Sequence, residues 1–259
     1  MEGRDIVYIL KNDVKPDELR YSLRSVCENF PHRNIVFVGG CPSGITCDYY
    51  INHKQEGTLK WQRAVSSMKR AFVDDHISDE FFLFNDDFFV LRKIDTDNFI
   101  NYTTGTLDKR INELEGNIGR SSSYSGALKR LKYSLKEAGK DTMSFALHLP
   151  FLINRHDAIE LIGKYPDLVM FRSLYGNVYN VPYMFHNDVK VYTNDKIPEF
   201  DDYLSTSDDA FKNGLIGEYI RNKFSRPCKY EAGYQPTKEL YTEEGDQLYE
   251  ILPMEGGLV

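Results

Sequence analysis

An amide and two adjacent carboxylates interrupt an apolar run near the middle of the chain. The run spans residues 81–91 and reads Phe-Phe-Leu-Phe-Asn-Asp-Asp-Phe-Phe-Val-Leu. Its apolar residues predict a buried strand. Because an unpaired buried carboxylate is costly, we expect Asp86 and Asp87 at the strand end, facing a cation or a cleft. Side chains alternate along a strand, so Asn85 and Asp87 would point to one side and Asp86 to the other.

Asn85 and Asp87 would then present two hard oxygen ligands at one edge of the strand. Mg²⁺ and Mn²⁺ favour such donors and can keep coordination positions open for a diphosphate. We therefore predict a Mg²⁺ or Mn²⁺ site at Asn85 and Asp87, with Asp86 among the residues that bind the diphosphate-bearing ligand. The alternative is an aspartate pair that caps a turn between two strands.

Two arginines on a predicted helix are further candidates for diphosphate binding. Arg20 and Arg24 lie one helical turn apart, so both could face the same ligand. Guanidinium groups bind phosphate oxygens in a bidentate manner. Solvated arginines on a helix surface are an equally good interpretation.

Three more residues could take part in proton or phosphate chemistry. His148 lies between two leucines, so on a strand it would point away from both and toward a cleft. Its imidazole could accept a proton from a hydroxyl or attack phosphorus, unless it is a satisfied core histidine. Arg172 could neutralise a transferring phosphate or form a structural salt bridge. Asp208 is a candidate general base, although Ser205-Thr206-Ser207 before it predicts a helix cap.

The elements that position these residues alternate between strands and helices. Strands are predicted at residues 5–10, 34–40, 49–52, 81–91, 147–153 and 189–192, and helices at 19–30, 59–74, 157–165 and 208–223. This order predicts an α/β fold with a mostly parallel central sheet flanked by helices, whose ligands bind beyond the carboxyl ends of the strands. The strand ends at residues 10, 40 and 86 should converge on one cleft.

Residues 1–230 are predicted to form one domain, and residues 231–259 an acidic C-terminal tail. The domain would carry a helical insertion at residues 93–145, which either walls the acceptor side of the cleft or is merely a solvated helical face. The tail has seven acids and one lysine, which is −6 of the formal charge of −7. The near-neutral remainder argues against a large basic surface. A nucleic-acid partner is therefore disfavoured, although the basic stretch at 129–136 keeps it open.

Compartment and redox state follow from what the sequence lacks. No apolar run approaches the ~20 residues needed to cross a bilayer, and the N-terminus has no apolar signal region. The four cysteines show no CxxC pairing. We expect a cytoplasmic protein with reduced thiols and no transmembrane segment.

Several segments resemble the Stealth proteins, the sugar-1-phosphate transferases of bacterial capsule synthesis. The similar residues are Asp5-Ile6-Val7-Tyr8, the run Glu18 to Val26, Phe84-Asn85-Asp86-Asp87-Phe88-Phe89, His148-Leu149-Pro150 and Phe171-Arg172-Ser173. Residues 171–177 and 205–209 resemble segments of small bacterial and phage glycosyltransferases of the GT-A type. The Asn-Asp-Asp spacing is similar to the Asp-x-Asp signature of nucleotide-sugar transferases.

Both resemblances imply a GT-A-like (Rossmann-like) fold, a nucleotide-sugar donor and a hydroxyl acceptor on a glycan, as in polysaccharide biosynthesis. They differ about the bond that breaks. The chain departs from the Stealth pattern after its first strand, at Lys11-Asn12-Asp13, and after its second, at Val38-Gly39-Gly40. We therefore expect a metal-dependent glycosyltransferase. The alternatives are a Stealth-like sugar-1-phosphate transferase, a glycosyltransferase acting on modified DNA bases, and an inactive carbohydrate- or nucleotide-binding domain.

Overall fold

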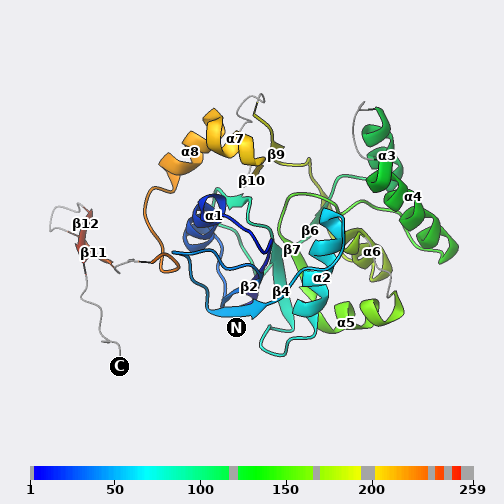
Figure 1. Ribbon diagram of the computed structural model, residues 1–259, viewed down its shortest axis with the longest axis horizontal. Coiled ribbons are helices and arrows are strands. Elements are labelled where there is room, and N and C mark those ends of the chain that lie inside the picture. The colour runs from blue at the N-terminus through cyan, green and yellow to red at the C-terminus, as the bar shows by residue number, and fades with distance from the viewer. Residues whose placement is uncertain are drawn as a thin grey trace.

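A five-stranded sheet in the order β3-β2-β1-β4-β7 forms the centre of the protein (Figure 1). The structure is a computed structural model and describes residues 3–116, 122–165, 170–193, 202–232, 237–241 and 247–251. The strands are β1 (Asp5–Leu10), β2 (Ile35–Gly39), β3 (Tyr49–Asn52), β4 (Glu80–Phe84) and β7 (Phe151–Asn154). The first four pair in parallel, and β7 joins β4 antiparallel. The predicted mostly parallel α/β sheet is confirmed.

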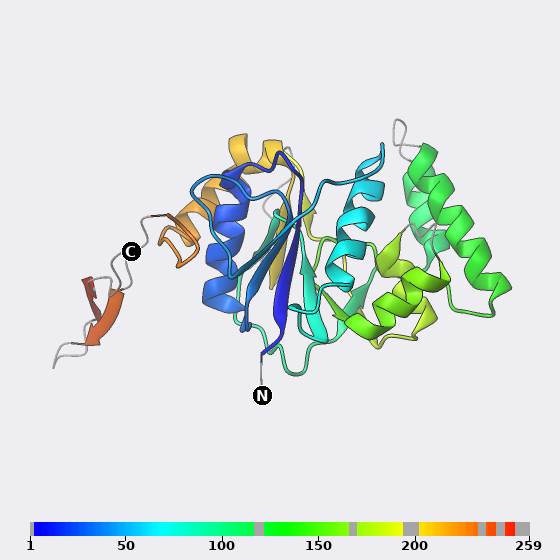
Figure 2. The same cartoon turned by 60° about the horizontal axis from the view of Figure 1, so that its bottom comes forward.

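Helices cover both faces of this sheet, because β1 alternates between two buried sets of side chains. Ile6, Tyr8 and Leu10 pack with α1 (Pro16–Asn29), and Val7 and Ile9 pack on the opposite side. The helices on that second side are α2 (Lys60–Phe72), α5 (Arg155–Lys164) and α6 (Phe171–Val178). Figure 2 shows α1 and α2 on the two sides of the sheet. A strand buried on both faces explains why residues 5–10 are almost uniformly apolar.

The predicted single strand at residues 81–91 is wrong. β4 ends at Phe84, and β5 (Phe88–Val90) belongs to a second sheet in the order β5-β10-β9. Asn85, Asp86 and Asp87 form the turn between them, with the Phe88 N–H 3.3 Å from the Asn85 carbonyl oxygen. Three successive polar side chains cannot continue a buried strand, and Asn and Asp favour turns. The alternation argument for Asn85 and Asp87 therefore fails, and a metal site at these two residues stays a prediction.

The second sheet brings distant parts of the chain to the Asn-Asp-Asp turn. β10 (Tyr203–Thr206) pairs antiparallel with β5 and parallel with β9 (Lys190–Val191). α7 (Asp208–Asn213) and α8 (Leu215–Lys223) follow β10 and pack on this sheet through Phe211 and Ile220. The single helix predicted at 208–223 is divided at Gly214. A Cβ there would lie 2.6 Å from the Ala210 carbonyl oxygen, so the break requires glycine.

His148 is not on a strand, contrary to the prediction. β7 begins only at Phe151, and residues 147–150 form an irregular segment before it. Pro150 has no N–H to donate to a neighbouring strand, which accounts for the late start. The direction of the His148 side chain is therefore set by its contacts and not by strand alternation.

The insertion at residues 93–145 is helical, as predicted, and shares the main core. It contains β6 (Asn101–Thr103), α3 (Leu107–Gly116) and α4 (Ser122–Glu137), and β6 pairs with β8 (Tyr183–Phe185). Leu107, Ile111, Leu128 and Leu131 pack in the same cluster as the central sheet. Its role as a wall of the acceptor site stays a prediction.

The predicted acidic tail, residues 231–259, lies mostly outside the described residues. Within it, β11 (Thr237–Tyr241) and β12 (Gln247–Ile251) pair antiparallel. Among the helices that the structure describes, none is both long and apolar enough to cross a membrane.

Candidate active site

The carboxyl ends of β1, β2 and β4 meet at one edge of the central sheet, as predicted. Leu10 is in register with Gly39, and Tyr8 with Phe84. Gly39 has φ +110°, and a Cβ there would lie 2.1 Å from the Leu10 carbonyl oxygen. Only glycine permits so close an approach of the two strand ends. The Asn-Asp-Asp turn follows directly from the third strand end, so it lies at this edge.

Four acidic side chains from three elements gather here, and we call them the carboxylate cluster: Glu18, Asp86, Asp87 and Asp208. Glu18 lies in the first turn of α1 and Asp208 in the first turn of α7. The Thr206 hydroxyl donates to Glu18 Oε1 over 3.1 Å, and the Lys190 ammonium contacts both Asp87 Oδ2 and the Thr206 carbonyl oxygen. Thr206 therefore links α1 to the Asp87–Lys190 pair.

The cluster holds more negative charge than its neighbours compensate. Burial and then the charge of Asp87 raise the pKa of Glu18 to about 7, and the charges of Asp208 and Asp86 act in the same direction. Burial and the charge of Asp87 also raise the pKa of Asp86 to about 6, although Lys11 opposes this shift. Such raised pKa values are typical of sites that bind a cation or transfer protons.

Glu18→Gln should stabilise the protein above neutral pH in buffer without divalent cations. The pKa of Glu18 is raised, so the folded state disfavours its ionised form and wild-type stability falls as pH rises from about 4.5 to about 7. Glutamine is neutral and keeps the acceptor for Thr206. We expect the variant to be more stable by about 2 kcal/mol at pH 8 and equal to wild type at pH 4.

Thermal unfolding at both pH values tests this, with Glu28→Gln on the exposed side of the same helix as the control. A Glu18→Gln variant that is less stable than wild type at pH 8 would contradict the crowding of charge in the cluster.

Asp188, which is not part of the carboxylate cluster, holds His148 through two hydrogen bonds. Asp188 accepts from the His148 backbone N–H over 3.1 Å and from Nδ1 over 3.0 Å. Burial alone would raise the pKa of Asp188, but the hydrogen bond and charge of His148 outweigh it and hold that pKa below the ordinary value. The His148 side chain is 33% exposed, and within the described part of the chain Nε2 has no hydrogen-bond partner. Nε2 is therefore oriented and available to a ligand.

Arg172 supports the segment that carries His148. Its Nη1 donates to the carbonyl oxygens of Leu147 and Leu149, over 2.8 and 2.7 Å. Burial lowers the pKa of Arg172 to about 10, against the charges of Asp87 and Asp188, so the side chain stays cationic at neutral pH. The structure thus brings Arg172 near the charge of Asp87 and into contact with the carbonyl oxygens on both sides of His148.

Arg20 and Arg24 both pair with one buried acid, Glu231. Arg20 Nη1 lies 2.6 Å from Glu231 Oε2, and Arg24 contacts both carboxylate oxygens of Glu231 over 2.7 Å. Their side chains thus have a structural role that neither of the two interpretations anticipated. Donor binding by Arg20 or Arg24 stays a prediction.

The metal prediction can be examined at Asp87. Among the described residues, no three His, Cys, Asp or Glu side chains converge as a metal site. Asp87 Oδ2 faces Lys190, but Oδ1 is buried and has no hydrogen-bond partner in the described part of the structure. A hard oxygen donor without a partner, amid excess negative charge, fits a cation that takes its other ligands from water and a diphosphate. Asn85 and Asp87 remain the predicted ligands.

No protein-family model and no curated protein sequence matches the chain. Among solved structures, the galactosyltransferase LgtC in complex with donor and acceptor sugar analogs superposes with a TM-score of 0.47 at 13% identity, over 88% of this chain and 98% of that one. The glycosyltransferase GlyE of Streptococcus pneumoniae TIGR4 gives 0.42 at 13% identity, over 86% of this chain. The match spans 61% of the GlyE chain. Because these scores are low, we infer function from the residues of this chain alone.

Sequence reasoning missed three residues of the site: Glu18, Asp188 and Lys190. Glu18 read as part of a helix start, and Lys190 as a position on a strand. Each joins the site only through contacts made far along the chain, such as Glu18 with Thr206 and Lys190 with Asp87. The one local signal was the two acids in the first turn of α1, and a helix N-terminus explains these without any site.

Proposed function

We propose that the protein is a metal-dependent glycosyltransferase, which moves a sugar from a nucleotide diphosphate-sugar to a hydroxyl of a glycan-like acceptor. The observation that supports this most directly is the carboxylate cluster with Lys190 at the carboxyl edge of a parallel sheet, where α/β proteins bind nucleotides. A diphosphate bridged to carboxylates by a cation fits such a site.

Asn85 and Asp87 would hold Mg²⁺ or Mn²⁺. When bound, the metal would neutralise charge on the nucleoside diphosphate as it departs. Lys190 already contacts Asp87 and is 14% exposed, so its ammonium supplies a fixed positive charge in the same place. The exposed Lys11 adds positive charge that lowers the pKa of Asp86. Together these residues would bind the donor and orient its anomeric carbon toward the acceptor.

His148 is the better candidate for the base that takes the acceptor proton. Its Nδ1 is held by Asp188, which would stabilise the imidazolium after Nε2 accepts the proton. Asp208 is exposed in the first turn of α7 with Ser207 as the N-cap. The Ser207 cap explains the position of Asp208 without a catalytic role, so His148 is preferred.

A Stealth-like sugar-1-phosphate transferase is the second candidate, and the His148–Arg172 arrangement favours it. In phosphoryl transfer, charge builds on the oxygens of the phosphorus that is attacked, so a cation and a histidine near that phosphate become central. Arg172 braces both carbonyls beside His148 and interacts with the charge of Asp87. The missing Stealth residues after the first two strands weigh against it.

The by-product of transfer separates the two candidates. We expect a nucleoside diphosphate, because glycosyl transfer breaks the bond at the anomeric carbon. Chromatography of reactions with UDP-, GDP- and CMP-linked sugars and a glycan acceptor measures this. A nucleoside monophosphate released from a UDP- or GDP-sugar, with sugar phosphate on the acceptor, would refute glycosyl transfer and favour the Stealth-like reaction.

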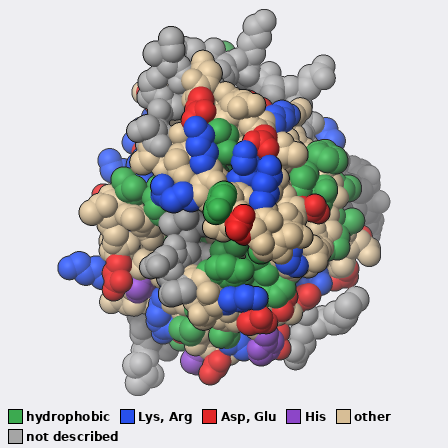
Figure 3. Space-filling model, turned by 90° about the vertical axis from the view of Figure 1, so that its right-hand side faces the viewer, with side chains coloured by type: hydrophobic (Ala, Val, Ile, Leu, Met, Phe, Trp, Pro, Cys, Tyr) green, Lys and Arg blue, Asp and Glu red, His purple; other side chains and the backbone are tan. Residues whose placement is uncertain are grey.

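The DNA-modifying alternative loses support from the ion pairs of the basic stretch. Lys129 lies 2.5 Å from Glu115, and Lys132 pairs with Asp108, so two of its cations join α4 to α3. On the face that carries these helices, Lys and Arg are interspersed with Asp and Glu (Figure 3).

Donor binding without any donor hydrolysis under Mg²⁺ or Mn²⁺ would indicate the remaining alternative, an inactive carbohydrate- or nucleotide-binding domain.

A further inference from the structure

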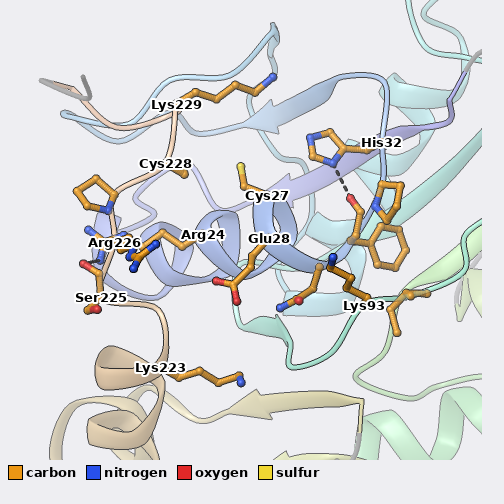
Figure 4. Close-up of a pocket in the computed structure, with 15 residues that line it drawn as sticks. Arg24, Cys27, Glu28, His32, Lys93, Lys223, Ser225, Arg226, Cys228 and Lys229 are labelled. Atoms are coloured by element: carbon orange, nitrogen blue, oxygen red, sulfur yellow. Dashed lines mark hydrogen bonds between the residues drawn. The ribbon is translucent and has the colours of Figure 1, made fainter. Parts of the chain in front are cut away.

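A cavity of about 1260 Å³ opens beside α1, and no residue of the carboxylate cluster lines it. Its walls come from α1, from residues 93 and 94, from the end of α8 and from residues 225–229, which we call the α1-clasping segment (Figure 4). The charged side chains that line it are five cations and one acid: Arg24, Lys93, Lys223, Arg226, Lys229 and Glu28. The lining therefore carries a net positive charge, although two of its cations have acidic partners outside the lining: Arg24 pairs with Glu231, and Lys229 lies 3.9 Å from Asp48.

Two thiols lie together on the wall of this cavity. Cys27 comes from α1 and Cys228 from the α1-clasping segment, and Figure 4 shows both beside the same space. The Cys27 thiol donates a hydrogen bond to the Cys228 sulfur. Cys27 is exposed, whereas Cys228 is only 7% exposed. The Cys27 thiol is thus open to small molecules, and the Cys228 thiol, its hydrogen-bond partner, is buried.

The surroundings distinguish the two thiols chemically. The hydrogen bond from Cys27 holds the pKa of Cys228 below its ordinary value, with Arg24 acting in the same direction and burial acting against it. The same hydrogen bond and burial raise the pKa of Cys27. Thiolates are the nucleophiles of disulfide exchange and form readily near cations. Cys228 is therefore the more acidic thiol of the pair and can take the Cys27 proton along their hydrogen bond, and Cys27 is the thiol that a small molecule can reach.

The backbone around Cys228 is already fastened to α1 and to the loop before β3. The Cys228 N–H donates to Glu231 Oε1 over 2.9 Å, and Glu231 is paired with Arg24 of α1. The Thr46 N–H donates to the Tyr230 carbonyl oxygen over 2.8 Å. These contacts hold the backbone that carries Cys228 beside α1 before any covalent bond forms.

We propose that Cys27 and Cys228 form a reversible disulfide in exchange with an anionic low-molecular-weight disulfide of the glutathione type. The electropositive cavity attracts the anionic disulfide, and the exposed Cys27 thiol reacts with it first. The product would bind the α1-clasping segment covalently to α1.

The exchange takes two balanced steps. The Cys228 thiolate accepts the Cys27 proton along their hydrogen bond, and the Cys27 sulfur attacks one sulfur of glutathione disulfide, forms a mixed disulfide and releases one glutathione thiolate, which takes the proton back from Cys228. The Cys228 thiolate then attacks Cys27 Sγ, forms the protein disulfide and releases the second glutathione. Both released thiolates take up protons, so two protein thiols and one glutathione disulfide give one protein disulfide and two glutathione thiols.

The disulfide should stabilise the fold, because it closes a loop of about 200 residues in the unfolded chain. We expect the melting temperature of the oxidised protein to exceed that of the reduced protein by about 5 °C or more. Reduction with dithiothreitol should reverse the shift.

The test incubates the full chain in glutathione buffers of increasing oxidised fraction and follows intact mass and linked peptides. We expect the intact mass to fall by two hydrogen atoms. We also expect one disulfide-linked peptide pair to appear, which joins Cys27 to Cys228. The Cys41→Ser/Cys47→Ser double variant should behave the same, because neither thiol lines the cavity. Cys27→Ser should lose both the link and the melting shift.

Two results would overturn the proposal. One is glutathione attached to Cys41, the other exposed thiol, in buffers where no Cys27–Cys228 link has formed. The other is a melting shift that persists in Cys27→Ser. The first result is measured on wild type and the second on Cys27→Ser, a variant at an exposed position. Neither measurement requires replacement of the buried Cys228.

Discussion

We expect Asp87→Asn to lower sugar transfer by about three orders of magnitude while the protein stays folded. Asp87 has the one carboxylate in the Asn-Asp-Asp turn that contacts Lys190, and its buried Oδ1 has no partner among the described side chains. Asparagine keeps the shape but removes the charge that would hold a divalent cation against a diphosphate.

The fold should tolerate this change because two effects oppose each other. The variant loses the ion pair with Lys190, which leaves that ammonium with the Thr206 carbonyl oxygen. It also removes the repulsion that Asp87 exerts on the carboxylates of Glu18 and Asp86, since the charge of Asp87 raises the pKa of both. We therefore expect the melting temperature to change by only a few degrees.

Thermal-shift measurements with nucleotide sugars, with and without Mn²⁺, together with turnover assays, check this prediction. Wild type should be stabilised by a donor only with the metal, and Asp87→Asn should show no donor shift. Asp209→Asn is the matched control, because Asp209 contacts Thr193 and Asn213 and lies outside the carboxylate cluster. A variant that turns over at the wild-type rate with chelator present would remove the metal from the proposed function.

The central sheet could be predicted from the sequence because each of its strands is a short apolar run between turn residues. Residues 5–10 and 49–52 were predicted with the observed bounds, and α1 and α2 followed from helical spacing. The same rule failed at residues 81–91. Apolar residues continue on both sides of the turn, so composition alone could not show that β4 and β5 belong to different sheets.

Only part of the candidate site could be predicted from the sequence, for a related reason. Asp86 and Asp87 stand out because polar residues interrupt an apolar run, which is a local signal. Lys190 and Glu18 carry no such signal, since their roles depend on pairing between β9 and β10 and between α1 and Thr206. Residues that gain function through long-range contacts cannot be found without knowing which elements meet.

Glu231 shows the same limit, and it supports a prediction with a large effect on stability. It opens the segment predicted to be an acidic tail, yet its side chain is 3% exposed and paired with Arg20 and Arg24. Breaking a buried pair leaves uncompensated charge, and here two guanidinium groups would lose their partner. We expect Glu231→Gln to lower the free energy of unfolding by about 3 kcal/mol, and the melting temperature by about 10 °C.

Thermal unfolding at neutral pH measures this, and Glu80→Gln is the control. Glu80 pairs with Arg4 at 2.8 Å, but its side chain is 48% exposed, so its loss should cost under about 1 kcal/mol. The pH dependence gives a second reading. Although burial opposes it, the hydrogen bonds of Arg24, the Cys228 N–H and Arg20 hold the pKa of Glu231 below the ordinary glutamate value.

The stability that Glu231 contributes is therefore complete above that ordinary value and is lost as pH falls through the lower folded pKa. Wild type and Glu231→Gln should accordingly converge in acid and differ most near neutral pH. If Glu231→Gln unfolds at the wild-type temperature at pH 7, the ion pairs with Arg20 and Arg24 do not hold the C-terminal segment to α1. Both arginines would then return to being candidates for binding the donor diphosphate.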